Sequence, residues 1–163
     1  MIKHLLLLTT LLMPLSSSGQ SSSIVGTWLL TAADKILPDG TRVPDYGVSP
    51  HGIAIFTPDG YCSIQVYRTD RGGFSSGDKF KGTPEEYKAA TLGMSVLFGR
   101  YTVDPSTNTL TLHIDRSSVP NLDDTTQVRH YEMKGDDISW KVPQRADGSI
   151  PITVLRRAPR EHP

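Results

Sequence analysis

Short runs of β-branched, aliphatic and aromatic residues recur along the chain after residue 23, separated by turn-forming residues at intervals of about ten. This pattern predicts eight strands, at residues 26–33, 52–57, 61–68, 96–104, 110–115, 127–133, 138–142 and 150–156. Asp-Gly and Asn-containing turns, which accept positive φ angles, separate several of these runs. Consecutive strands joined by such turns are antiparallel neighbours, so the sequence predicts an all-β antiparallel sheet.

The alternation of apolar and polar residues within the strands indicates the surroundings of each face of this sheet. In the strand predicted at 110–115, aliphatic residues alternate with polar ones such as Thr111 and His113. The strand predicted at 61–68 has Ile64 on an apolar face and Gln65 and Tyr67 on the other, so both faces carry groups that can be buried. We therefore predict an eight-stranded up-and-down barrel with a partly polar, ligand-sized interior.

One helix is expected in this chain. Thr83-Pro84-Glu85-Glu86 is a capping box with proline at the first helical position, and it predicts a helix from Pro84 to Ala90 or Leu92. The preceding segment, Thr69 to Gly82, is long and rich in glycine, serine and charge. Loops of this length are usually functional or mobile, so the loop and helix together are predicted to close one end of the barrel.

The N-terminus has the features of a secretory signal over residues 1–19: an early lysine, the apolar run from Leu5 to Leu15, and small residues up to Gly19. The apolar run is too short to span a bilayer. The predicted organisation is a signal at 1–19, a polar tail at 20–23, one barrel domain at 24–158 and a C-terminal tail at 159–163. The expected location is outside the cytoplasm, periplasmic or secreted.

Charge and cysteine content exclude several classes of protein. The chain has 17 basic and 17 acidic side chains, so a nucleic-acid-binding protein, which usually has a basic excess, is disfavoured. Cys62 is the single cysteine, so no internal disulfide forms, and we expect a buried thiol. No His or Cys pair has metal-ligand spacing, and neither a metal nor a cofactor is predicted.

A structural contact is predicted where the first and last strands meet. Gly26-Thr27-Trp28 opens the first strand and Arg157 ends the last. An arginine stacked on the tryptophan would make a cation–π contact and plug the floor of the barrel. We prefer this interpretation to a ligand contact for Trp28.

Several of these motifs, in this order, resemble the bacterial and fungal lipocalin-like domain proteins. The resemblance covers Val25 to Arg157 and rests on Gly26-Thr27-Trp28, Asp39-Gly40-Thr41, Arg68-Thr69-Asp70-Arg71, Ser76-Gly77-Asp78, Gly82-Thr83-Pro84-Glu85-Glu86, Gly99-Arg100-Tyr101 and Gln127-Val128-Arg129. It implies a calycin-type barrel that binds a small, largely apolar molecule, without implying a reaction. The chain departs from the family in having Leu155-Arg156 before Arg157, where an aromatic and an acidic residue are common.

The leading functional hypothesis is an exported protein that binds a small hydrophobic or amphipathic ligand inside the barrel. The residues predicted to contact the ligand are Gln65, Tyr67, Tyr101, His113, Gln127 and Arg129. A buried arginine needs a partner for its charge, and a ligand carboxylate is one candidate for Arg129, beside Asp115 or a tyrosine hydroxyl. The opposing interpretation of Arg129 is a solvated strand residue.

Two alternatives remain open at this point. One is an isomerase or lyase in which His113 or Tyr101 moves a proton and Arg129 stabilises an enolate-like oxygen. It requires these side chains to converge within the barrel. The other is an envelope scaffold with a filled core and no ligand, and the oligomeric state is not predicted.

Overall fold

The computed structural model describes residues 23–159. Its strands are β1 (Gly26–Ile36), β2 (Arg42–Pro44), β3 (His51–Phe56), β4 (Tyr61–Tyr67), β5 (Met94–Asp104), β6 (Thr109–Ser117), β7 (Thr125–Lys134), β8 (Asp137–Lys141) and β9 (Ile150–Arg157). Its helices are α1 (Pro84–Leu92) and the short 3₁₀ helix η1 (Pro120–Leu122). The predicted signal, most of the predicted polar tail and the last four residues lie outside the described residues.

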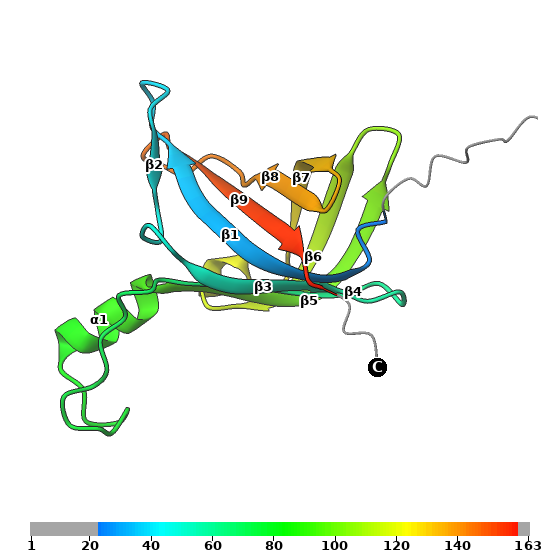
Figure 1. Cartoon of the computed structure of the whole chain (residues 1–163). Coiled ribbons are helices and arrows are strands. Elements are labelled where there is room, and N and C mark those ends of the chain that lie inside the picture. Colours follow the sequence, from blue (N-terminus) through cyan, green and yellow to red (C-terminus); the bar gives the residue numbers. More distant parts are fainter. Residues whose placement is uncertain (1–22, 160–163) are drawn as a thin grey trace, which may run out of the picture.

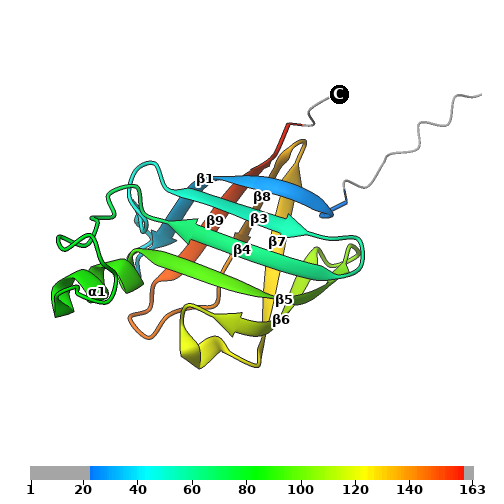
Figure 2. The ribbon, with the colours of Figure 1, turned by 90° about the horizontal axis from the view of Figure 1, so that it is seen from below.

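The strands form one antiparallel sheet in the order β2-β1-β3-β4-β5-β6-β7-β8-β9, and β1 also pairs with β9. This last pairing closes β1 and β3 to β9 into an eight-stranded barrel, as Figures 1 and 2 show. The predicted fold class is therefore confirmed. The short strand β2, which pairs only with the end of β1, was not predicted.

The predicted turns connect adjacent strands as expected. Gly60 between β3 and β4, Asn108 between β5 and β6, and Gly135 between β7 and β8 have φ angles of 88°, 50° and 59°. These three hairpins lie at the same end of the barrel, because β3, β5 and β7 run in the same direction around it. We call this the hairpin end.

The inner faces of the strands form the core of the barrel. Trp28, Phe56 and Trp140 are almost completely buried, and the Phe56 and Trp140 rings meet edge to face at 6.3 Å. Leu110 and Leu112 of β6 are also fully buried, as their alternation predicts. Cys62 points into the same core and burial raises its pKa to about 11, so the thiol is neutral at neutral pH.

Helix α1 forms at the predicted place, but it does not cover the barrel. Thr83 Oγ1 accepts a hydrogen bond from Glu86 N at 3.2 Å, and the Glu86 carboxylate accepts one from Thr83 N at 2.8 Å, which completes the capping box. None of the helical residues is buried, and the helix projects away from the barrel (Figures 1 and 2). The predicted closure of one end by this segment is wrong, because the helix lacks an apolar face that would hold it there.

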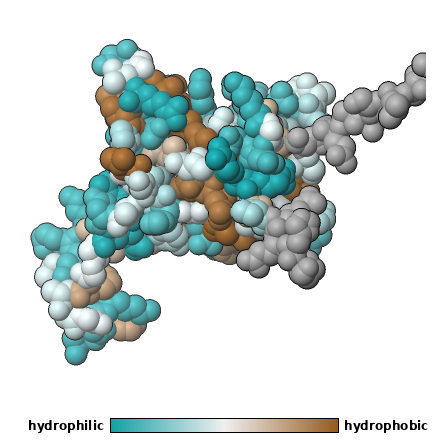
Figure 3. All heavy atoms as spheres, in the orientation of Figure 1, coloured by the Kyte–Doolittle hydropathy of each residue, from teal (hydrophilic) through white to brown (hydrophobic). Residues whose placement is uncertain are grey.

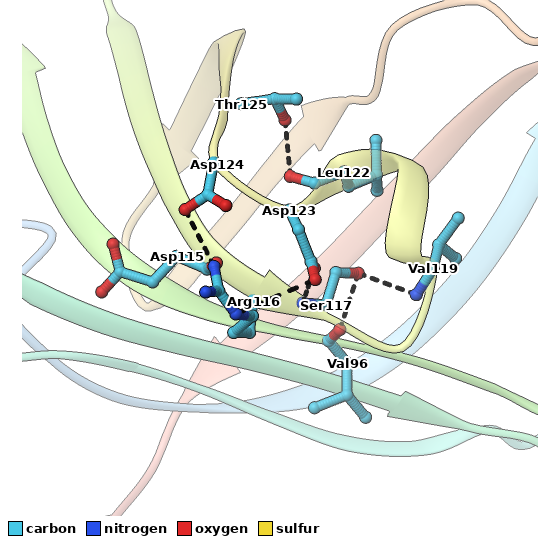
Figure 4. A network of polar contacts seen from close by, with 9 residues as sticks. All are labelled: Val96, Asp115, Arg116, Ser117, Val119, Leu122, Asp123, Asp124 and Thr125. Carbon is cyan, nitrogen blue, oxygen red and sulfur yellow. Dashed lines mark hydrogen bonds and ion pairs between the residues drawn. The ribbon is translucent and has the colours of Figure 1, made fainter.

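A polar network fixes the connection between β6 and β7 at the end of the barrel opposite the hairpin end (Figure 4). Arg116 Nη1 donates to Asp124 at 2.8 Å, and Asp123 accepts from Ser117 N at 2.7 Å. Thr125 Oγ1 donates to the Leu122 carbonyl at 2.6 Å. These bonds set the start of β7, the strand that carries Gln127 and Arg129.

The outer face of the barrel also carries apolar side chains. Leu29 of β1, Ile55 of β3 and Phe98 of β5 are 44%, 36% and 50% exposed. Figure 3 shows apolar residues along the face on which β1 and β3 lie. Within residues 23–159, no helix has the length and apolar character needed to cross a membrane.

Candidate functional site

A cavity of about 670 Å³ lies at the hairpin end of the barrel, beside the segment that leads into β1. Its wall includes Ile24 from this segment, Pro58 and Gly60 from the β3–β4 turn, and Asn108 from the β5–β6 turn. Inward-facing side chains of the barrel complete it: Tyr101 and Val103 of β5, and Tyr131 and Met133 of β7. The lining thus combines aromatic and aliphatic side chains with polar groups, among them Ser23, Thr102 and Asn108.

Contacts with neighbouring residues of the barrel hold Tyr101 and Tyr131 in place. Tyr101 donates a hydrogen bond from its hydroxyl to the Thr57 carbonyl at 2.8 Å, and its ring meets Phe56 edge to face at 5.0 Å. Tyr131 is 7% exposed, and its backbone N–H donates to the Asn108 carbonyl at 2.9 Å. Burial raises the pKa of both phenols, so both stay neutral and can act as hydrogen-bond donors.

The residues predicted to plug the barrel floor hold the N-terminal segment that lines the cavity. Arg157 lies over the Trp28 ring, with 4.1 Å between its Cζ and the ring centroid. Its guanidinium donates to the carbonyls of Val25 and Ser23 at 3.0 and 2.8 Å. Gly26 has φ 130°, and a Cβ there would lie 3.1 Å from Arg157 Nη1. This arrangement anchors Ser23 to Val25, which line the cavity.

Arg129 and Gln127 point into the barrel, as predicted. Arg129 is 5% exposed, and its Nη2 donates to Gln127 Oε1 at 2.9 Å. Its Cζ lies 5.8 Å from the centroid of the Trp140 ring. Burial lowers the pKa of the Arg129 guanidinium to about 10, so the group is still charged at neutral pH. The interpretation of Arg129 as a solvated residue is wrong.

Three other side chains predicted to face the interior lie on the outside. Gln65 and Tyr67 share the outer face of β4, where the Tyr67 hydroxyl donates to Gln65 Oε1 at 3.2 Å. His113 is exposed on β6, with its Nδ1 3.2 Å from Thr126 Oγ1. The predicted inward orientation of these three residues is wrong. The reason is alternation itself, because Ile64 and Leu112, on the neighbouring positions, occupy the inner face.

The proton-transfer arrangement of the enzyme hypothesis does not form. His113 faces solvent, the Tyr101 hydroxyl is bonded to a backbone carbonyl, and Arg129 lies inside the barrel. These groups therefore share no point at which a substrate could meet all of them. Over residues 23–159, no cluster of three or more His, Cys, Asp or Glu side chains could hold a metal ion.

Some residues of the cavity were not among the predicted ligand contacts. Alternation places Tyr131 and Met133 on the same face of β7 as Arg129, but neither was predicted to contact a ligand. Ile24 had no such signal, since it precedes the first predicted strand. The packing of that segment depends on the distant Arg157.

Comparison with known protein families shows which family the chain belongs to. The model of the lipocalin-like domain matches residues 25–154, which run from the start of β1 into β9. The chain belongs to this family. The predicted resemblance is thereby confirmed, and the match includes β1 and the first part of β9, the strands that close the barrel.

A solved structure is also similar to this lipocalin-like chain. It is the crystal structure of a lipocalin-like protein from Bacteroides uniformis ATCC 8492 at 1.79 Å resolution, with 13% sequence identity and a TM-score of 0.42. The alignment covers 82% of this chain and 97% of that one. A search of curated proteins finds no match.

Proposed function

We propose that this lipocalin-like protein binds a small, largely apolar molecule in the cavity at the hairpin end. The observation that carries the proposal is the cavity itself, about 670 Å³ in volume and lined by Tyr101, Val103, Tyr131 and Met133. Cavities of ~300–1,000 Å³ with mainly apolar walls and a few polar groups are typical of small-molecule sites. The scaffold hypothesis requires a barrel with no such space.

The two tyrosines give the proposed ligand its polar contact. Tyr101 and Tyr131 are on different strands and both line the cavity. The Tyr101 hydroxyl already donates to the Thr57 carbonyl and so offers a ligand only an acceptor, whereas the neutral Tyr131 phenol can also donate one hydrogen bond. This pair suits a ligand with a single oxygen-containing group. The apolar side chains of the wall, such as Val103 and Met133, favour an apolar ligand body.

We also propose that the protein acts outside the cytoplasm, after removal of residues 1–19. The support is the sequence of this segment, with its basic start, apolar run and small residues before Gln20. N-terminal sequencing of protein recovered from the periplasm or the medium tests it. Recovery of the uncleaved chain from the cytoplasm would contradict export.

Filling the cavity tests the binding proposal. The neutral fluorescent probe N-phenyl-1-naphthylamine is expected to bind the native protein saturably, and Val103→Trp is expected to weaken this binding at least tenfold by occupying the cavity. Met133→Trp, from the opposite wall, is a second variant with the same expected effect. Fluorescence titration measures both.

Val128→Trp is the matched control for these variants. Val128 is on the outer face of β7 and is 53% exposed, so an added indole there leaves the cavity unchanged. Its probe affinity is expected to equal that of the native protein. Absence of saturable binding to the native protein, or equal loss in all three variants, would contradict the proposal and favour a scaffold.

A further inference from the structure

The interior of the barrel contains a positive charge without a counterion. Arg129 is only 5% exposed, and among residues 23–159 its guanidinium forms no salt bridge. Its one side-chain acceptor is the neutral amide oxygen of Gln127. A buried charge is costly unless an opposite charge or several hydrogen bonds compensate for it.

Two buried donors beside this charge are unused. Arg129 Nε and Trp140 Nε1 have no hydrogen-bond partner, although both are shielded from solvent. They belong to side chains in contact, since the guanidinium lies over the Trp140 ring at 5.8 Å. Both atoms can only donate. What is missing at this point is therefore an acceptor, and preferably a charged one.

Cys62 does not supply the missing charge. It is the titratable side chain that favours the charged form of Arg129, and its own pKa is raised to about 11 by burial. The thiol is thus protonated at neutral pH and carries no charge. Among residues 23–159, therefore, no side chain supplies a counterion for Arg129.

The sheet is open beside Arg129 on one side. Residues of β7 from Thr125 to His130 pair with β6, but β7 pairs with β8 only from Tyr131 to Lys134. Figure 2 shows β7 and β8 separating away from their hairpin. Next to Arg129, therefore, no backbone ladder joins β7 to β8, and Val142, which follows β8, packs against the core. Side chains can move aside for a small group at lower cost than a hydrogen-bonded ladder.

We infer that Arg129 and Trp140 form a subsite for the acidic group of an amphipathic ligand, most simply a carboxylate. A carboxylate has two acceptor oxygens and one negative charge, so it satisfies both unused donors and the uncompensated guanidinium at once. Tyr131, two residues from Arg129 on the same inner face of β7, lines the cavity that would hold the apolar part. The inference rests on the proposed function and narrows its ligand to an acid.

A matched pair of probes tests this subsite directly. Octanoate and 1-octanol have the same chain length and differ in the acidic group, and their binding to the mature protein at neutral pH can be compared by calorimetry. The native protein is expected to bind octanoate at least tenfold more tightly than octanol. Arg129→Met, an apolar replacement of similar length, is expected to abolish this preference and to change octanol affinity less than twofold.

The control is Arg100→Met. Arg100 is an exposed arginine on the outer face of β5, where its guanidinium lies over the Tyr61 ring at 5.2 Å. It has the same charge as Arg129 and no access to the interior. This variant is expected to retain the full preference for octanoate, which excludes a general effect of net charge.

The two tryptophans provide a second measurement that needs no variant of Arg129. Trp28 Nε1 is already bonded to the Ile24 carbonyl at 2.8 Å, whereas Trp140 Nε1 is unbonded. In a ¹H–¹⁵N spectrum, octanoate is expected to shift the Trp140 indole signal downfield and to leave the Trp28 signal in place. Trp140→Phe assigns the signals.

The outcomes separate this inference from the proposed function. Equal affinity for octanoate and octanol, with no shift of the Trp140 signal, would overturn the acidic subsite and leave the apolar cavity as the binding site. Failure of both probes to bind would overturn both proposals. A preference for octanoate that survives Arg129→Met would move the acidic subsite elsewhere and overturn the role of Arg129.

Discussion

Arg157 joins three parts of the molecule through one side chain. It stacks on Trp28, and its two terminal nitrogens hold the carbonyls of Val25 and Ser23. A lysine has the charge but lacks the planar fork that reaches two carbonyls and a ring together. The residue therefore depends on its shape as well as its charge.

Removing this side chain tests its contribution to stability. Arg157→Met is expected to lower the free energy of unfolding by about 2–4 kcal/mol, because it removes a cation–π contact and two charged hydrogen bonds. Urea denaturation measures the change. The neighbouring Arg156 pairs with Asp137 on the surface, so Arg156→Met is expected to leave stability nearly unchanged. Equal effects would show that the stacked geometry contributes nothing.

At the level of single residues, alternation of side chains was the informative part of the sequence. The inward positions of Gln127 and Arg129 follow from it, and so does the outward position of His113 once Leu112 and Ile114 are given the inner face. The error for Gln65 and Tyr67 arose because both faces of β4 carry groups that can be buried. What one sequence does not contain is the partner of each inward polar group. The unpaired donors of Arg129 and Trp140 became visible only in three dimensions.

Helix α1 illustrates how local sequence determines an element but not its place. The capping box predicts the helix and its start, because those contacts lie within four residues. The position of the helix depends on burial, and none of its residues is buried. Strand β2 is the opposite case, since it has only three residues and exists because it pairs with the end of β1. No local pattern could have predicted it.

Glu86 connects α1 to the loop before it, and this contact depends on pH. Its carboxylate accepts hydrogen bonds from Ser75 N and Thr83 N, both at 2.8 Å, and these bonds lower its pKa below the usual glutamate value of 4.5. A lowered pKa means that the stabilisation is complete above pH 4.5 and is lost as the pH falls through the folded-state value.

We therefore expect α1 to fray in acid before the barrel unfolds. Carbon chemical shifts of residues 84–92 are expected to move toward random-coil values as the pH falls below 4.5, while those of the barrel stay constant. In Glu86→Gln, the helix is expected to be frayed already at neutral pH, with little further change in acid. Glu85→Gln, one residue away and outside the capping box, is the control and should behave as the native chain.

At the scale of the whole molecule, an ion-pair cluster ties together two connections at the end opposite the hairpins. Asp45, between β2 and β3, accepts two hydrogen bonds from Arg145, between β8 and β9, at 3.0 and 2.6 Å. Lys35 of β1 lies 3.5 Å from the same carboxylate. The Asp45 side chain is only 10% exposed, so water screens the cluster poorly.

Neutralising Asp45 tests this cluster. Asp45→Asn is expected to lower the free energy of unfolding by about 1–3 kcal/mol, since it leaves two cations near one another without their carboxylate. Asp137→Asn, which removes the exposed partner of Arg156, is the matched control and is expected to have little effect. Thermal denaturation of both variants measures the difference, and a stable Asp45→Asn protein would show that the two connections are held by other contacts.

The closure of the barrel by β1 and β9 also governs when the protein can fold. The Ser23 carbonyl and the guanidinium that binds it are 134 residues apart in sequence, and β1 and β9 depend on each other for their hydrogen bonds. Until residues 150–157 are available, β1 and β8 each have an unpaired edge. The segment from Ser23 to Val25 then also lacks its hydrogen bonds to Arg157. Contacts this distant in sequence form slowly, because the intervening chain must lose its freedom first. A chain still in synthesis therefore cannot complete the barrel before residues 150–157 have been made.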